Sequence, residues 1–202
     1  MFDKSSWIEV LKNRLPGEEA HQIMAPSFRG SFKHEDEPSR AAVMALLYPA
    51  GEEVYLILIK RNEYDGPHSG QVSFPGGAWE EHDGTLENTA IRETREELGI
   101  REDIEILGEL TPLYIPVSNF LVAPFLGWLS GRPEYRPDGS EVQYVIEVSL
   151  EELLNPDNCR SERMYRHDHF VEAPFYLAGK EKIWGATAMM LSEILQLAST
   201  LP

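Results

Sequence analysis

The chain has 202 residues, of which 42% are hydrophobic and 26% charged, a composition typical of a globular protein with its own core. Its 34 acidic residues outnumber its 18 basic ones, and the net charge of −16 argues against nucleic acid as a partner. No apolar run approaches the ~20 residues that span a bilayer, so we expect no membrane partner.

The N-terminal sequence lacks the basic start and apolar stretch of a signal peptide. Cys159 is the only cysteine, so no internal disulfide can form. From these two features we expect a cytoplasmic protein.

The first forty residues predict a helix and a polar linker. Ser5 and Ser6 are candidate caps for a helix whose apolar residues between Trp7 and Leu15 recur at helical spacing. Pro16-Gly17 would end this helix, and residues 34–39 form the linker.

The remaining sequence alternates strand and helix patterns. Asp83 or Thr85 as a cap and Gly99 as a stop predict a charged helix over residues 86–98. A short helix is predicted at 151–154 and a final helix at 186–198. Strands are predicted at 41–48, 54–60, 104–107, 113–117, 121–129 and 144–148, with turns at 49–52 and 138–139 and a hairpin within 164–184.

Three glutamates of the helix over 86–98 share one of its faces. Glu93, Glu96 and Glu97 have the spacing i, i+3, i+4, and such close like charges are costly unless a cation lies between them. Mg²⁺ and Mn²⁺ prefer such hard oxygen ligands. The alternative is a solvated acidic face, the usual meaning of a charge run. Gly76-Gly77 favours the metal site, because glycines let a main-chain carbonyl approach an ion closely.

The segment from Gly77 to Ile100 resembles the Nudix box. Its second half, residues 92–100, is similar to the family pattern at every defining position except Thr94, where an aliphatic residue is usual. The usual loop glutamate is replaced by Asp83, and the spacer before Arg92 holds one extra residue. This departure leaves open whether Asp83 is a metal ligand.

The resemblance implies a fold of the α/β (α+β) class, a Nudix-like α/β/α sandwich with a mixed sheet. It also implies a hydrolase of small-molecule diphosphates that uses Mg²⁺ or Mn²⁺. Glu93, Glu96 and Glu97 would hold the metal together with the Gly77 carbonyl. We expect one domain over residues 1–202, with the N-terminal helix and linker at 1–39 and the catalytic core at 40–202.

Two carboxylates are candidates for the general base that takes a proton from the attacking water. Glu96 lies among the ligands, and Glu141 follows a Pro-Asp-Gly-Ser loop that could bring it over the site. Arg92, four residues before Glu96, is placed to form an ion pair with it.

Segments outside the box are similar to the coenzyme A pyrophosphatase branch of the family: residues 68–77, 113–118, 122–125 and 183–188. This similarity implies cleavage of coenzyme A into 3′,5′-adenosine diphosphate and 4′-phosphopantetheine. The branch carries Leu-Arg where this chain has Asp65-Gly66, so Arg61 or Lys60 would have to supply the anion contact. His68 and Gln71 are either substrate contacts or braces of their loop.

Two other functions stay open. One is hydrolysis of another diphosphate, such as ADP-ribose or a nucleoside triphosphate, and the other is a binding module without catalysis. The intact glutamates favour catalysis. A zinc site at His167-Asp168-His169 is disfavoured because no third ligand accompanies it. The assembly is not fixed by the sequence, and a homodimer is one option.

Overall fold

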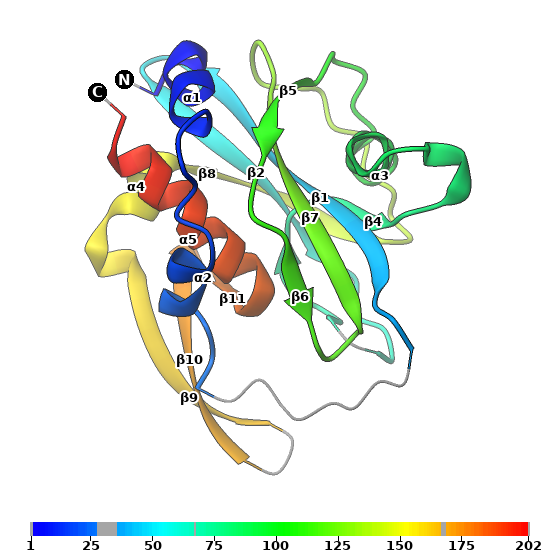
Figure 1. The fold of residues 1–202 in the computed structure, drawn as a ribbon, viewed down its shortest axis with the longest axis vertical. Coiled ribbons are helices and arrows are strands. Elements are labelled where there is room, and N and C mark those ends of the chain that lie inside the picture. Colours follow the sequence, from blue (N-terminus) through cyan, green and yellow to red (C-terminus); the bar gives the residue numbers. More distant parts are fainter. Residues whose placement is uncertain (1, 28–35, 67, 167–168, 202) are drawn as a thin grey trace.

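The computed structural model describes residues 2–27, 36–66, 68–166 and 169–201 (Figure 1). His167 and Asp168 of the disfavoured zinc site and part of the 34–39 linker lie outside these ranges. None of the described helices is both long and apolar enough to cross a membrane.

A mixed sheet of eight strands forms the middle layer of the molecule. Its order is β3-β2-β1-β7-β5, with β4 paired to β1, β6 to β7 and β8 to β2. Strands β1 and β7 run parallel, and the other pairs are antiparallel. The strands are β1 (Ser39–Ala50), β2 (Glu53–Arg61), β3 (Val72–Ser73), β4 (Gly76–Ala78), β5 (Glu105–Glu109), β6 (Leu113–Ile115), β7 (Phe120–Trp128) and β8 (Val142–Ser149).

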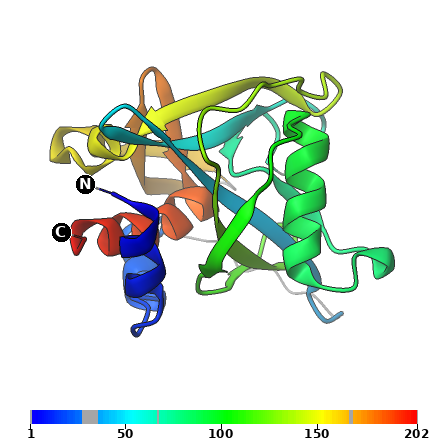
Figure 2. The ribbon, with the colours of Figure 1, turned by 90° about the horizontal axis from the view of Figure 1, so that it is seen from above.

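Helices cover both faces of this sheet, which confirms the expected α/β/α sandwich. Helix α3 (Leu86–Leu98) packs on one face, and α1 (Lys4–Leu11), α2 (Glu18–Ile23) and α5 (Gly185–Ser199) pack on the other (Figure 2). The side-chain alternation of β1 explains the two cores. Ala42, Met44 and Leu46 face α3, whereas Ala41, Ala45 and Leu47 join the core under α5.

A smaller sheet follows the helix α4 (Leu150–Leu154). The predicted hairpin within 164–184 is wrong in detail, because three strands form two hairpins in the order β11-β10-β9. They are β9 (Cys159–Arg166), β10 (His169–Ala178) and β11 (Glu181–Trp184). Gly179, with φ +59°, provides the left-handed turn that makes the second hairpin possible.

The N-terminal prediction needs two corrections. Asp3, not Ser5 or Ser6, caps α1, because its carboxylate accepts the Ser6 N–H at 3.0 Å. The helix ends at Leu11, and the sequence reading missed α2, which begins after Gly17. Gly17 has φ +61°, and its N–H donates to the buried Glu193 of α5 at 3.0 Å, so a tertiary contact fixes the start of α2.

Candidate active site

Helix α3 has the predicted boundaries and caps. The Thr85 hydroxyl accepts the Asn88 N–H at 3.2 Å, and Gly99 ends the helix in the left-handed conformation. Thr94 and Leu98 are fully buried against the sheet. The helix therefore presents its glutamates toward the glycines of β4.

Glu97 is the most buried of the three glutamates, with 2% of its side chain exposed. Its Oε2 accepts the Gly76 N–H at 2.8 Å, and its Oε1 lies 3.3 Å from Arg61 Nη1. Burial raises the pKa of Glu97 to about 7, despite the hydrogen bond from Gly76 and the charge of Arg61. Keeping this carboxylate buried therefore lowers the stability of the fold.

Glu93 packs directly on the backbone of Gly77. A Cβ atom at position 77 would lie 2.5 Å from Glu93 Cδ, so only glycine leaves room for the carboxylate. Burial raises the pKa of Glu93, although its carboxylate also accepts a hydrogen bond from Arg92. Gly76 is required for another reason, because a Cβ there would meet Ala42 O at 2.4 Å.

Arg92 connects the acidic residues of the site. Its Nη1 donates to Glu93 Oε1 and to Glu96 Oε2, both at 2.9 Å, so the ion pair predicted with Glu96 is present. Its Nη2 also donates to the Ala78 carbonyl at 3.2 Å. The guanidinium therefore orients two of the three glutamates.

Asp83 belongs to this network but not as a free carboxylate. Its Oδ1 accepts Arg92 Nε at 2.7 Å, and its Oδ2 accepts Arg92 Nη2, the Thr89 hydroxyl and the Glu80 N–H at 2.9–3.0 Å. The bond to Arg92 is the main reason why the pKa of Asp83 lies far below its usual value. Both oxygens are occupied, so Asp83 braces Arg92.

Glu141 lies at the edge of the same cluster. Its side chain is exposed, and its charge contributes to the raised pKa values of Glu93 and Glu97. The loop that carries it is anchored, since Asp138 N–H donates to Glu97 O at 3.1 Å and Asn62 N–H to Glu141 O at 2.9 Å. Glu141 is therefore close enough to act on the site electrostatically.

The donor set suits a hard divalent cation, because it consists of carboxylates and a backbone segment that glycine leaves open. Among the described residues, no three acidic, histidine or cysteine side chains are gathered as around one ion. Arg92 bridges Glu93 and Glu96, whereas Glu97 is turned to Gly76. Glu96, with 59% of its side chain exposed, has the most freedom to turn.

A cavity of about 330 Å³ lies on the α5 face of the sheet and is lined by Gly76 and Gly77, which Glu97 and Glu93 contact. Arg61 lines it and contacts Glu97, which connects the cavity to the acidic cluster. Lys60 points elsewhere and pairs with Glu181 at 3.0 Å, so Arg61 is the cation available here. The cavity is also lined by His68, Gln71, Ser118, Thr187 and Met190.

His68 and Gln71 both brace their loop and line the cavity. The His68 ring contacts Gln71 Oε1 at 3.3 Å and the Ser118 hydroxyl at 3.1 Å, and burial lowers the pKa of His68. Ser118 and Asn119 could, from the sequence, either form a turn or line the pocket, with the turn favoured. Asn119 lies in a turn, with φ +54°, but Ser118 faces the cavity.

The sequence reading missed the contribution of α5. Thr187 and Met190 line the cavity, and the Thr187 hydroxyl donates to the Val72 carbonyl at 3.1 Å. The similarity of residues 183–188 to the coenzyme A branch was the signal that could have placed this helix at the site.

The sequence of this chain is similar to those of known proteins. A model of the NUDIX domain matches residues 38–169. The mitochondrial coenzyme A diphosphatase NUDT8 of Homo sapiens is 35% identical over 164 residues, covering 79% of this chain and 70% of that protein. The mouse protein of the same name is 31% identical over 193 residues, covering 93% and 91%.

Solved structures show a similar fold. A MutT/nudix family protein from Enterococcus faecalis aligns with a TM-score of 0.53 at 17% identity, covering 96% of this chain and 73% of that one. The MutT protein of Methanosarcina mazei also aligns with a TM-score of 0.53, at 18% identity, covering 83% and 99%.

Proposed function

The chain belongs to the Nudix hydrolase family, and we propose that it hydrolyses the diphosphate linkage of coenzyme A or a derivative with the help of Mg²⁺ or Mn²⁺. The products would be 3′,5′-adenosine diphosphate and 4′-phosphopantetheine. The observation that carries the metal-dependent chemistry is the packing of Glu93 and Glu97 against the Gly76-Gly77 backbone.

Glu93, Glu96 and Glu97 would hold the cation together with the Gly77 carbonyl. A bound divalent cation neutralises charge on the diphosphate and acidifies a water molecule. A buried carboxylate, Glu97, and a half-buried one, Glu93, cost stability unless a cation compensates them, and the raised pKa values of both agree with this cost. Exposed Glu96 would complete the set by leaving its ion pair with Arg92.

The remaining residues have separate tasks. Arg61 would contact a phosphate group where the cavity meets Glu97. His68 and Gln71 would contact the substrate from the cavity wall. Glu96 and Glu141, both exposed, remain the two candidates to accept the proton of the attacking water. Loss of turnover without loss of metal affinity in Glu141→Gln would identify Glu141 as the base, and unchanged turnover in that variant would leave Glu96.

The coenzyme A assignment is supported by the two relatives whose names state that activity. The alternative, another nucleoside diphosphate derivative such as ADP-ribose, is favoured by Gly66 at the position of the branch arginine. A reducing compartment is proposed from the single Cys159. The names of the two relatives place those proteins in mitochondria.

The test is incubation of the pure protein with Mg²⁺ and coenzyme A, with products identified by mass spectrometry. ADP-ribose runs in parallel, and the Glu97→Gln variant is the control. Appearance of 3′,5′-adenosine diphosphate and phosphopantetheine with the unmodified protein alone supports the proposal. If coenzyme A survives while ADP-ribose is cut, the substrate assignment is wrong. If neither is cut, a screen of other diphosphates decides between a different substrate and a binding module.

A further inference from the structure

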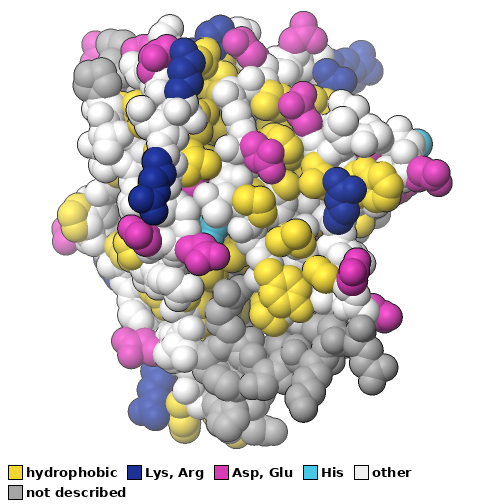
Figure 3. Space-filling model, in the orientation of Figure 1, with side chains coloured by type: hydrophobic (Ala, Val, Ile, Leu, Met, Phe, Trp, Pro, Cys, Tyr) yellow, Lys and Arg dark blue, Asp and Glu magenta, His cyan; other side chains and the backbone are white. Residues whose placement is uncertain are grey.

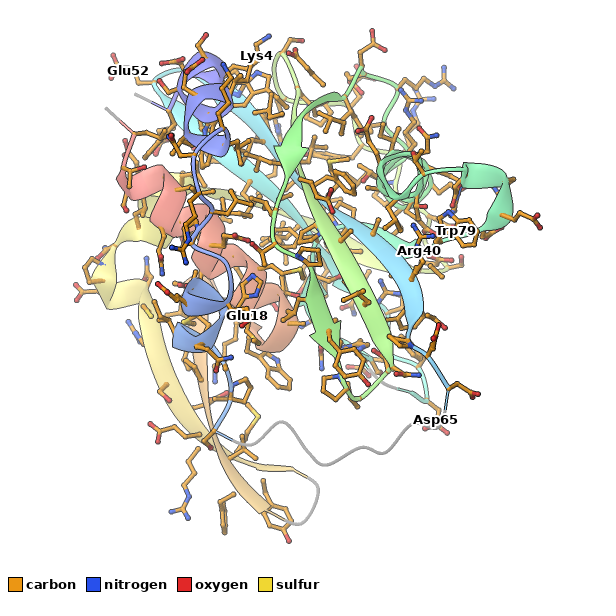
Figure 4. The ribbon with its side chains drawn as sticks, viewed as in Figure 1. Lys4, Glu18, Arg40, Glu52, Asp65 and Trp79 are labelled. Carbon is orange, nitrogen blue, oxygen red and sulfur yellow. The ribbon has the colours of Figure 1, made fainter. Side chains whose placement is uncertain are left out.

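An arginine and a tryptophan form a stacked pair at the rim of the site. Arg40 lies at the start of β1, and Trp79 follows β4 directly. The backbone N–H of Trp79 donates to the Arg40 carbonyl at 2.9 Å, and Arg40 Cζ lies 5.1 Å from the centroid of the indole ring. Figure 4 labels both residues, which lie next to each other at one edge of the molecule. Figure 3, a space-filling view in the same orientation, shows basic and hydrophobic side chains side by side along that edge.

The charge of Arg40 is not neutralised within the described part of the protein. No carboxylate there lies within ion-pair distance of its guanidinium, although the chain has 34 acidic residues. Glu80, the residue after Trp79, instead receives the N–H of Asp83 in a short 3-10 helix and lies 3.3 Å from the His82 ring. Stacking uses the flat face of a guanidinium and leaves its N–H groups available.

The pair lies close to the groups that would act on the diphosphate. Ala78, between Gly77 and Trp79, gives its carbonyl to Arg92, which bridges Glu93 and Glu96. The neighbouring residues Ala41 and Ala78 line the cavity. A substrate that places its diphosphate at the glutamates would therefore bring adjacent groups within reach of Arg40.

Coenzyme A carries a third phosphate, a monoester on the ribose, besides its diphosphate. The two cations nearest the glutamates have other tasks, since Arg61 would contact a phosphate of the diphosphate beside Glu97 and Arg92 contacts three carboxylates. The loop position at which the branch has an arginine is Gly66, and Figure 4 shows its neighbour Asp65 well apart from Arg40. A cation for the monoester must therefore come from another element.

We propose that Arg40, held in place by Trp79, binds the phosphate monoester of the substrate and so distinguishes coenzyme A from its analogue without that group. This inference rests on the proposed function for the identity of the substrate. Trp79 acts as a positioning residue, because it restricts the guanidinium before the substrate arrives. Arg40 makes a charge-assisted contact that the analogue cannot use.

The kinetic test compares coenzyme A with dephospho-coenzyme A. Arg40→Gln should lower kcat/KM for coenzyme A by about 10- to 100-fold, the value of a hydrogen bond to a charged group, mainly through KM. The kcat/KM for dephospho-coenzyme A should change by no more than about twofold. Trp79→Leu should lower kcat/KM only for coenzyme A, by about 2- to 5-fold, as the loss of a cation–π contact predicts.

Arg14→Gln is the matched control, because it removes the same charge from an exposed arginine between α1 and α2, on the other face of the sheet. This variant should leave kcat/KM unchanged for both substrates. If Arg40→Gln lowers kcat/KM equally for the two substrates, or does not lower it for coenzyme A, the inference is overturned.

A binding measurement separates this inference from the proposed function. Calorimetry with 3′,5′-adenosine diphosphate and with AMP needs no turnover. The unmodified protein should prefer the ligand with the 3′-phosphate, and Arg40→Gln should lose that preference. If neither coenzyme is hydrolysed but the preference depends on Arg40, the proposed function fails and the binding site stands. If the unmodified protein shows no preference, the binding site fails.

Discussion

Replacing Gly77 with alanine should abolish most activity while leaving the fold intact. The added Cβ would lie 2.5 Å from Glu93 Cδ, whereas carbon atoms in contact are about 3.5 Å apart. The Glu93 carboxylate must therefore move by about 1 Å, and a displacement of this size at a catalytic centre costs about 100-fold in rate. The atom that moves is the end of a flexible side chain, so the free energy of unfolding should change by less than about 1 kcal/mol.

Three measurements check this reasoning: kcat with Mg²⁺, Mn²⁺ affinity by calorimetry, and the free energy of unfolding in urea without metal. Gly76→Ala is the matched control. Its Cβ would meet the Ala42 carbonyl at 2.4 Å and Val43 Cα at 2.6 Å, at φ +151°. Backbone must then shift, so this variant should lose several kcal/mol of stability, about 2–6. Near-normal turnover and metal affinity in Gly77→Ala would refute the role given to Glu93.

Three further predictions concern single carboxylates. Glu97→Gln keeps an acceptor for the Gly76 N–H but removes the charge, so turnover should fall by about 100-fold or more in a folded protein; near-normal kcat would contradict the metal assignment. Asp83→Asn weakens the pairing with Arg92 and should lower the free energy of unfolding in urea by about 1–3 kcal/mol and kcat by about 10-fold; an unchanged kcat would show that Arg92 needs no brace. Burial raises the pKa of Glu193, but His21, Thr111 and Gly17 outweigh it and hold the pKa below the usual 4.5. The unmodified protein should therefore exceed Glu193→Gln in urea stability at pH 7, and the difference should shrink as the pH falls below about 4.5; a difference independent of pH would contradict this sign.

Local sequence signals placed α3 correctly because its ends are determined by adjacent residues. The Thr85 cap and the left-handed Gly99 act within one helical turn of the residues they cap. The N-terminal helices were predicted less well, since Gly17 and the start of α2 depend on Glu193, far away along the chain. No local pattern contains that contact.

The candidate site likewise combines features that local spacing predicts with features that depend on the folded chain. Helical spacing alone brought Glu93, Glu96 and Glu97 to one region of α3, and the same spacing gave the Arg92–Glu96 ion pair. The sequence could not decide the task of Asp83, whose oxygens are occupied by Arg92 and Thr89 in the folded chain. The sequence also could not decide whether Lys60 or Arg61 supplies the cation for the anion contact.

Tertiary structure made the choice between those two cations. Lys60 and Arg61 are successive residues of β2, and successive side chains of a strand point to opposite faces, so only one of them can reach Glu97 of α3. The register of the sheet assigned Arg61 to Glu97 and Lys60 to Glu181. The sequence by itself determined the chemistry of the residues that could form the site. Pairing between distant strands and the packing of α5 decided which of them meet, because those contacts join residues that no local spacing relates.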